Sequence, residues 1–183
     1  GIISLLTSDR REEFPELEKD FLHYADQMLL KEVSNPYLIS TDKFAWGSNS
    51  DVANDGMLKL VAYRLTREDR YATSAMNDLH YLLGRNATGY SFVTGFGSKS
   101  PMHPHNRIMA ADGIEAPIPG YIVGGPNTIV PNDCDPEPVE RSPYPAASYT
   151  DTQCSFSTNE TAINWNAPLV FLSSGICNLT TAE

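Results

Sequence analysis

The chain has 183 residues and a formal net charge of −10 at pH 7. A hydrophobic fraction of 41% excludes a disordered tail, and the length suits one domain or part of one. The acidic balance disfavours nucleic acid as a partner, because a phosphate backbone needs a basic patch. No run of about 18 apolar residues occurs, so we expect no membrane-spanning helix.

Apolar side chains at helical spacing predict most of the regular structure. Ser8 or Asp9 is the expected cap of the first helix, and Gly84 fits the C-terminal cap of the third. Pro168 lies inside the fourth helix and predicts a kink or an early break there. The four predicted helices cover residues 11–32, 50–65, about 68–83 and a segment that starts near Ser157.

A long stretch from Arg85 to Phe156 separates the third and fourth predicted helices and holds most of the Pro and Gly residues. Long loops of this kind are usually functional, so we expect the helices to be the scaffold and the loop to carry the site. Four amphipathic helices leave broad apolar faces that need partners. Either the loop folds back as a lid, or further helices lie outside this chain.

The three cysteines, Cys134, Cys154 and Cys177, form no CxxC pair, so a zinc site has little support. Cys134 and Cys154 lie in polar, proline-rich sequence, where a disulfide would constrain a loop. Whether these two are bonded or are separate thiols stays open, and Cys177 is expected to lie outside such a bond.

A histidine and an arginine define the first candidate site. The segment from Ser91 to Arg107 reads SFVTGFGSKSPMHPHNR, and His105 and Arg107 are expected to alternate along an extended, proline-flanked stretch. Arg offers a planar set of donors and His can donate a hydrogen bond, so both suit sugar hydroxyls. The alternative is a structural loop in which Arg107 pairs with an acid.

Two carboxylates define the second candidate site. The segment YTDTQCSFSTNETAINWNAPL, Tyr149 to Leu169, places Asp151 and Glu160 nine residues apart among aromatic residues. Glycoside hydrolysis uses paired carboxylates, one of which protonates the leaving oxygen. Two structural alternatives stay open: Ser157-x-x-Glu160 matches a capping box, and Asp151 fits a turn.

Both segments resemble signatures of the family 9 glycoside hydrolases. The first resembles the segment that carries an active-site His and Arg, which correspond to His105 and Arg107. The second resembles the signature of an aromatic, an Asp, a second aromatic and a Glu ahead of an Asn-Ala pair, so its acids correspond to Asp151 and Glu160. The resemblance extends over about residues 20–176 and includes, in the expected order, the segments Trp46–Ser50, Leu82–Asn86 and Gly124–Asn127.

The resemblance implies an all-α fold, the C-terminal part of an (α/α)6 barrel with long active-site loops, in which residues 1–183 belong to a single catalytic domain. It implies an endoglucanase that hydrolyses β-1,4-glucosidic bonds of cellulose or related glucans with inversion. Glu160 would be the general acid, at about 6.5–9.5 Å from a base that activates water. His105 and Arg107 would bind glucose hydroxyls, and Asp151 would orient neighbouring groups.

One departure from the family matters. The general base of the family lies in an Asp-Ala-Gly-Asp motif, and this sequence has none. We therefore expect a truncated or cleaved portion that is inactive alone, with the missing N-terminal part of the same domain as its partner. Asn106 stands where relatives often carry a second His, and we expect little effect. An exo-acting relative and a non-catalytic carbohydrate-binding fragment are the alternative functions.

The remaining expectations follow from the same resemblance. The ligand is a β-glucan polysaccharide or oligosaccharide, and the location is extracellular or periplasmic. We identify no cofactor or metal site in this chain, and calcium is a candidate ligand of the complete enzyme. Asn86, Asn159 and Asn178 match the glycosylation pattern, and the match at Asn159 is expected to be accidental because a glycan would crowd Glu160.

Overall fold

The computed structural model describes residues 1–130, 133–135 and 139–181, and regular structure in this part of the chain is helical. No strand is present among these residues, although three isolated β-bridges are. The elements are α1 (Ile2–Leu6), η1 (Arg11–Glu13), α2 (Pro15–Glu32), α3 (Ser48–Thr66), α4 (Asp69–Leu82), α5 (Arg107–Ala111), η2 (Pro145–Ala147), α6 (Phe156–Asn159) and α7 (Ile163–Thr181).

Helix α2 confirms the first predicted helix but begins later than expected. Residues 11–13 form the short 3-10 turn η1, and α2 starts at Pro15 with Phe14 at the N-cap position. The expected cap by Ser8 or Asp9 was wrong. A proline ring clashes with the carbonyl four residues earlier, so Pro15 is favourable in the first turn of a helix and unfavourable further inside.

Helices α3 and α4 confirm the second and third predictions to within two residues at each end. Arg67 adopts a left-handed conformation with φ 61° and ends α3. Gly84 follows the C-cap of α4 with φ 122°, which is the position expected for a helix-terminating glycine.

The prediction of one helix from near Ser157 was wrong. The chain forms the single turn α6, then Glu160 in an extended conformation, and α7 begins at Ile163. The early break at Pro168 was also wrong, because α7 continues to Thr181. Pro168 lies near the start of α7, where the carbonyl that loses its partner, that of Asn164, belongs to an exposed residue.

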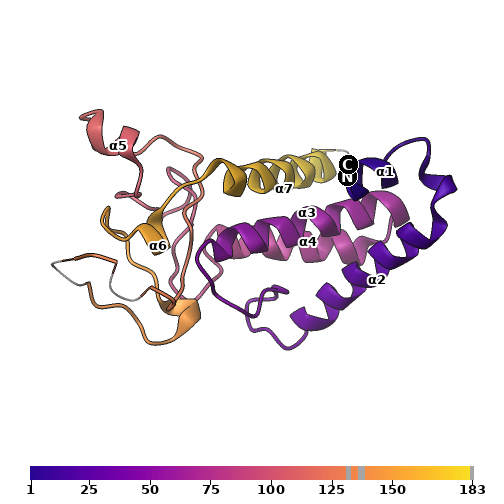
Figure 1. Ribbon diagram of the computed structural model, residues 1–183, viewed down its shortest axis with the longest axis horizontal. Helices are drawn as coiled ribbons and strands as arrows, with labels where there is room; N and C mark the ends of the chain where they lie inside the picture. Colours follow the sequence, from indigo (N-terminus) through magenta and orange to yellow (C-terminus); the bar gives the residue numbers. More distant parts are fainter. Residues whose placement is uncertain (131–132, 136–138, 182–183) are drawn as a thin grey trace.

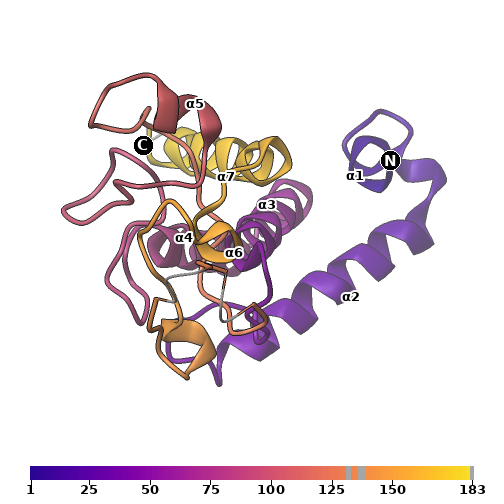
Figure 2. The same ribbon diagram turned by 60° about the vertical axis from the view of Figure 1, so that its left-hand side comes forward.

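Helix α3 packs against both α4 and α7, and α2 covers the far end of this group (Figure 1). Two glycines permit the close approach of α3 and α7: a Cβ added to Gly56 would lie 2.8 Å from Leu172, and one added to Gly175 would lie 2.5 Å from Leu60. Figure 2 shows α1 and the N-terminal part of α2 apart from α4 and α7.

Two apolar clusters hold these elements together. The larger joins α3, α4 and α7 to the long loop, and Phe92 and Ile122 of that loop are fully buried in it. The smaller joins α1 and α2 to α3 and α4 around Phe21, Met28 and Tyr71. The loop therefore folds back as part of the core at one end of the helices and does not form a separate lid.

Candidate functional site

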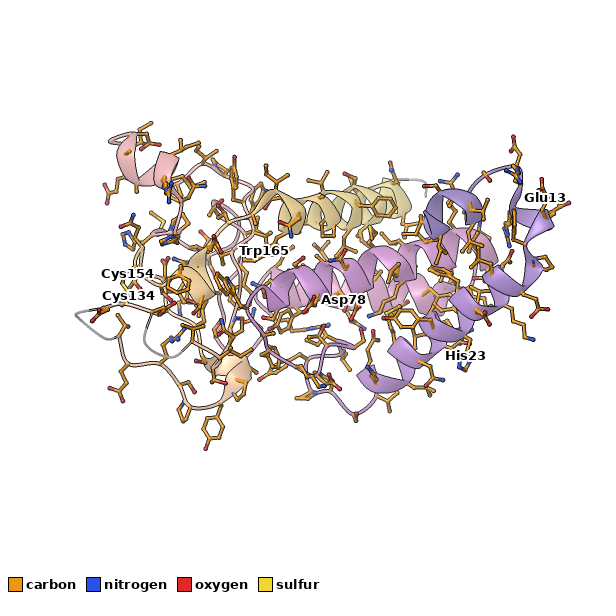
Figure 3. The ribbon with its side chains drawn as sticks, viewed as in Figure 1. Glu13, His23, Asp78, Cys134, Cys154 and Trp165 are labelled. Carbon is orange, nitrogen blue, oxygen red and sulfur yellow. A yellow bond between two sulfur atoms is a disulfide. The ribbon has the colours of Figure 1, made fainter. Side chains whose placement is uncertain are left out.

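Trp165, from the first turn of α7, packs against two glycines, Gly47 and Gly124, of the candidate site. A Cβ added to Gly47 would lie 3.0 Å from its ring, and one added to Gly124 would lie 3.2 Å from it. Next to these glycines, the Asn49 amide nitrogen donates to the main-chain oxygen of Val123 at 2.9 Å. The Trp46–Ser50 and Gly124–Asn127 segments, which the sequence analysis singled out, thus meet at the loop end of α7, near the Trp165 label in Figure 3.

Glu160 follows α6 directly and is half-buried, in extended conformation with φ −67° and ψ 148°. Its carboxylate makes no hydrogen bond or ion pair with any residue that the structure describes. The capping-box interpretation was wrong, because Ser157 lies inside α6 and its hydroxyl hydrogen-bonds to Asp133 at 2.6 Å. The Glu160 carboxylate is therefore available to a ligand.

His105 lies beside Glu160. The two residues form a parallel β-bridge, and the His105 N–H donates to the Asn159 carbonyl at 2.7 Å. Bridged segments run roughly 4.8 Å apart, and residues paired across such a bridge project their side chains to the same side. Main-chain hydrogen bonding thus brings together two residues that are 55 positions apart in the sequence. It places the His105 imidazole next to the Glu160 carboxylate.

Two aromatic rings extend this group. The His105 ring meets Phe156 edge to face with centroids 6.2 Å apart, and Phe156 lies 5.3 Å from the ring of Trp46. Trp46 is 47% exposed, which is unusual for so large an apolar side chain. Trp46 was not predicted to be a site residue, although the segment Trp46–Ser50 resembles the family.

Asp151 anchors the segment that leads to His105. Its carboxylate accepts hydrogen bonds from the main-chain N–H groups of Met102 at 2.7 Å and His103 at 3.0 Å. These contacts reach across about 50 residues of sequence, so Asp151 does more than form a local turn. Asp151 thus holds the main chain at Met102 and His103, and its expected role of orienting neighbouring groups stays a prediction.

Arg107 lies differently from the prediction. The chain is extended only as far as Asn106, whose side chain caps α5 by accepting from the N–H groups of Ile108 and Met109, and Arg107 is the first residue of α5. Its side chain is exposed and pairs with no acid among the described residues, so the structural ion pair considered for it is not formed here. Asn106 also donates to the Thr161 hydroxyl at 2.8 Å, which gives this residue a structural part that the sequence analysis did not foresee.

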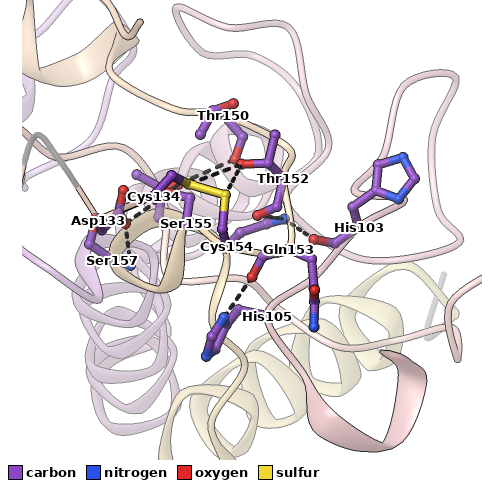
Figure 4. Close-up of a disulfide and its surroundings, with 12 residues drawn as sticks. His103, His105, Asp133, Cys134, Thr150, Thr152, Gln153, Cys154, Ser155 and Ser157 are labelled. Carbon is purple, nitrogen blue, oxygen red and sulfur yellow. Dashed lines mark hydrogen bonds between the residues drawn. A yellow bond between two sulfur atoms is a disulfide. The ribbon is translucent and has the colours of Figure 1, made fainter. Parts of the chain in front are cut away.

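Cys134 and Cys154 form a disulfide with a Cα–Cα distance of 5.1 Å, and Cys177 lies outside it. Beside the disulfide, the Asp133 carboxylate accepts from the Ser157 N–H at 2.8 Å and the Ser155 hydroxyl at 2.9 Å (Figure 4). Burial alone would raise the pKa of Asp133, but these hydrogen bonds lower it. The disulfide and the carboxylate together hold the start of α6 and, through it, Glu160.

His103 points away from this group, and its ring is turned to the other side of the chain from His105 in Figure 4. A cavity of about 300 Å³ opens beside His103 and is also lined by Glu115 and Gln153. Two larger hollows, of about 660 Å³ and 590 Å³, lie between helices at the opposite end and are mainly apolar. Within the described ranges, no three His, Cys, Asp or Glu side chains come together as a metal site, and no helix could span a membrane.

Comparison with known proteins places this geometry in a family. The family described as glycosyl hydrolase family 9 matches residues 6–173, and the chain belongs to it. It is 43% identical over 169 residues to a xyloglucan-specific endo-beta-1,4-glucanase, BoGH9A, of Bacteroides ovatus, covering 87% of this chain and 27% of that protein. It is 33% identical to endoglucanase D of Acetivibrio thermocellus, covering 100% of this chain and 26% of that protein.

Solved structures of the family confirm the fold. The chain superposes on AaCel9A in complex with cellobiose-like isofagomine with a TM-score of 0.83 and 32% identity, covering 97% of this chain and 34% of that one. The expected class is therefore confirmed: these relatives are (α/α)6 barrel enzymes, and this chain corresponds to a fragment of such a barrel. It spans about a quarter to a third of the length of the proteins that it matches.

Proposed function

We propose that this chain is the C-terminal part of the catalytic domain of an inverting β-1,4-glucan hydrolase and supplies its general acid, Glu160. The observation that carries the proposal is the bridge between His105 and Glu160. It sets a carboxyl group that has no hydrogen-bond or ion-pair partner among the described residues beside an imidazole and near the exposed ring of Trp46. Such a group can deliver a proton to a glycosidic oxygen while its neighbours bind the sugar.

His105 and Arg107 are the proposed sugar-binding residues. The His105 ring lies on the same side of the bridge as Glu160, and the Arg107 guanidinium projects from the first turn of α5 and pairs with no acid in the described part of the chain. Trp46 offers an apolar face of the kind that stacks on a glucose ring. Asp151 is proposed to act through the main chain, by holding the segment from Met102 to His105.

The general base and the rest of the barrel are proposed to lie outside this chain. Two observations support this. The chain spans about a third of AaCel9A, and two hollows of about 660 Å³ and 590 Å³, whose lining surface is mainly apolar, open between α1, α2, α3 and α7. We propose that the N-terminal part of the same domain fills them, and that this segment is inactive without it. Calcium stays a candidate ligand of the complete enzyme.

The proposed substrate is an internal bond of a β-1,4-glucan. BoGH9A is named as xyloglucan-specific, and AaCel9A was solved with a cellobiose-like ligand, so both support a glucan backbone. The Cys134–Cys154 disulfide supports a location outside the cytoplasm, because disulfides persist in oxidising compartments.

The test replaces Glu160 by Gln in the complete catalytic domain. Losing a general acid typically costs about 10²–10⁴-fold in rate, so we expect a loss of that order on a glucan with nearly unchanged binding. Glu140→Gln, which changes an exposed carboxylate, is the matched control and should keep its activity. Turnover of the Glu160 variant close to that of the wild type would rule out the proposal, and binding without hydrolysis by the wild-type domain would favour a carbohydrate-binding protein.

A further inference from the structure

Asn159, the residue before Glu160, is completely buried, and its side chain bonds to two separate segments, residues 149–152 and His103. Its amide oxygen accepts from the Tyr149 hydroxyl at 2.7 Å. Its amide nitrogen donates to the His103 carbonyl at 2.6 Å and to the Asp151 carboxylate at 3.0 Å. A carbonyl oxygen can only accept, so the nitrogen must face His103, and the orientation of the amide is determined.

The main chain of Asn159 holds the same segment a second time. While the side chain binds the carbonyl of His103, the Asn159 carbonyl accepts from the N–H of His105 at 2.7 Å. Asn159 thus binds the His103–His105 segment at two points, and Glu160 is the next residue in the chain. A shift of Asn159 would therefore move the His103–His105 segment, Glu160 or both.

We propose that Asn159 is a positioning residue that sets the proton donor Glu160 against the sugar-binding His105. The inference rests on the proposed function and adds to it a residue that touches neither substrate nor reacting atoms. Its burial also explains why the Asn159-Glu-Thr161 match to the glycosylation pattern is not a glycan site: the amide nitrogen is already bonded and shielded from solvent.

A merely structural residue would give the same burial and the same hydrogen bonds. A buried amide that loses a partner costs about 1–3 kcal/mol in any position. The two roles differ in what happens to the chemistry. If Asn159 positions the acid, its replacement slows the step in which a proton is delivered to the leaving group, over and above any loss of stability.

Asn159→Asp in the complete catalytic domain separates these roles. Asp has the same shape, but an ionised carboxylate cannot donate to the His103 carbonyl and repels Asp151. We expect kcat on a cello-oligosaccharide to fall by about 10²-fold or more, as for a misplaced general acid. On β-cellobiosyl fluoride, whose leaving group departs without protonation, kcat should fall only a few-fold. KM should rise by a similar factor for both substrates, because His105 moves as well.

Asn127→Asp is the matched control. Asn127 is also completely buried, and its amide nitrogen donates to the Ser157 carbonyl of α6 at 2.8 Å, but it touches neither His103 nor His105. We expect a loss of stability and equal changes of kcat on the two substrates. Equal losses of kcat on both substrates for Asn159→Asp would overturn the proposal, as would the same dependence on the leaving group for Asn127→Asp.

Tyr149→Phe provides a second test if Asn159→Asp does not fold. It removes one hydrogen bond to the Asn159 side chain and leaves those to His103, Asp151 and Thr152 in place. A smaller loss of kcat, again larger on the oligosaccharide than on the fluoride, is expected, and no difference between the substrates would overturn the proposal. If Glu160→Gln loses activity while Asn159→Asp and Tyr149→Phe each lose kcat equally on the two substrates, this inference fails and the proposed function stands. If Glu160→Gln keeps full activity, the proposed function itself fails.

Discussion

The Nδ1 atom of His105 lies 2.6 Å from the main-chain oxygen of Gln153. Since that oxygen can only accept, Nδ1 carries a proton, and in the neutral ring Nε2 is left as an acceptor. Gln153 precedes the disulfide residue Cys154, so the same stretch of chain that is covalently tied to Cys134 also sets the orientation of the imidazole. The nitrogen that can meet a sugar hydroxyl is therefore Nε2.

Replacing His105 by Asn or Gln tests which nitrogen acts on the substrate. The amide of Asn lies where Nδ1 was and can keep the hydrogen bond to Gln153, whereas the amide of Gln lies nearer to the position of Nε2. We expect His105→Asn to keep most of its stability and to lose about 10-fold in kcat/KM, the equivalent of one neutral hydrogen bond. His105→Gln should keep more activity and less stability. The opposite order, measured by kinetics and thermal unfolding, would show that Nδ1 is the important nitrogen.

Arg107→Ala should weaken both sugar binding and rate while leaving stability within about 0.5 kcal/mol, because the side chain is exposed and makes no ion pair among the described residues. Arg85→Ala is the comparison: Arg85 is also exposed, but it donates to the Asn77 side chain at 2.9 Å and to the Tyr37 carbonyl at 3.3 Å. It should lose stability and keep its KM. A change in thermal stability alone for Arg107→Ala would make Arg107 a structural residue.

Helix spacing alone was enough to predict α2, α3 and α4, because apolar side chains recur at helical intervals along each of them and each packs against another of the three. The boundary between α6 and α7 could not be predicted in this way. Glu160 is held in an extended conformation partly by a hydrogen bond from the Gly124 N–H to its carbonyl at 2.9 Å, and a contact of that separation leaves no local pattern. The capping-box pattern at Ser157 was for this reason misleading.

The candidate site shows the same limit. Residue spacing alone allowed structural roles for both Glu160 and His105. Only the family resemblance predicted that the two belong to one site. The structure brings them together through a main-chain bridge, yet their catalytic roles stay predictions. The disulfide, left open from the sequence, is present because the loop brings Cys134 and Cys154 to a Cα–Cα distance of 5.1 Å.

Removing the disulfide should destabilise the domain. Cys134 and Cys154 are 20 residues apart, and closing a loop of that size is worth about 3 kcal/mol by its effect on the unfolded chain. We expect a Cys134→Ser, Cys154→Ser double variant to unfold at a lower denaturant concentration than the wild type and to be insensitive to reductant. Cys177→Ser, which leaves the bond intact, is the control. Coincident unfolding curves for the wild type and the double variant would show that the bond does not stabilise the fold.

A buried charged cluster, which was not predicted from the sequence, links α2, α3 and α4. Lys59 is completely buried, with its ammonium group 2.6 Å from the Asp78 carboxylate and paired also with Glu32. Asp78 lies between the helices in Figure 3, and its second oxygen has no hydrogen-bond partner among the described residues. Burial raises the pKa of Asp78 well above its ordinary value, and Lys59 offsets this only in part.

The stability of the complete domain should therefore respond to pH through Asp78 in a definite direction. A raised pKa in the folded state means that the favourable contribution is complete below about pH 4, the unfolded value, and is lost as the pH rises through the folded value. Asn cannot titrate, so the Asp78→Asn variant should lack this pH-dependent contribution to stability. The free energy of unfolding of the wild type minus that of the variant should fall as the pH is raised from 4 towards neutrality, by about 1.4 kcal/mol for each unit of the shift.

Denaturant titrations of both proteins at a series of pH values measure that difference directly, and the contributions of ionisable groups outside the Glu32–Lys59–Asp78 cluster cancel in it. Asp9→Asn, which changes an exposed carboxylate, is the control and should track the wild type at every pH. A difference that stays constant would mean that Asp78 titrates alike in the folded and unfolded states. A difference that grows with pH would mean that attraction to Lys59 outweighs burial, and that the cluster is held together by a fully ionised pair.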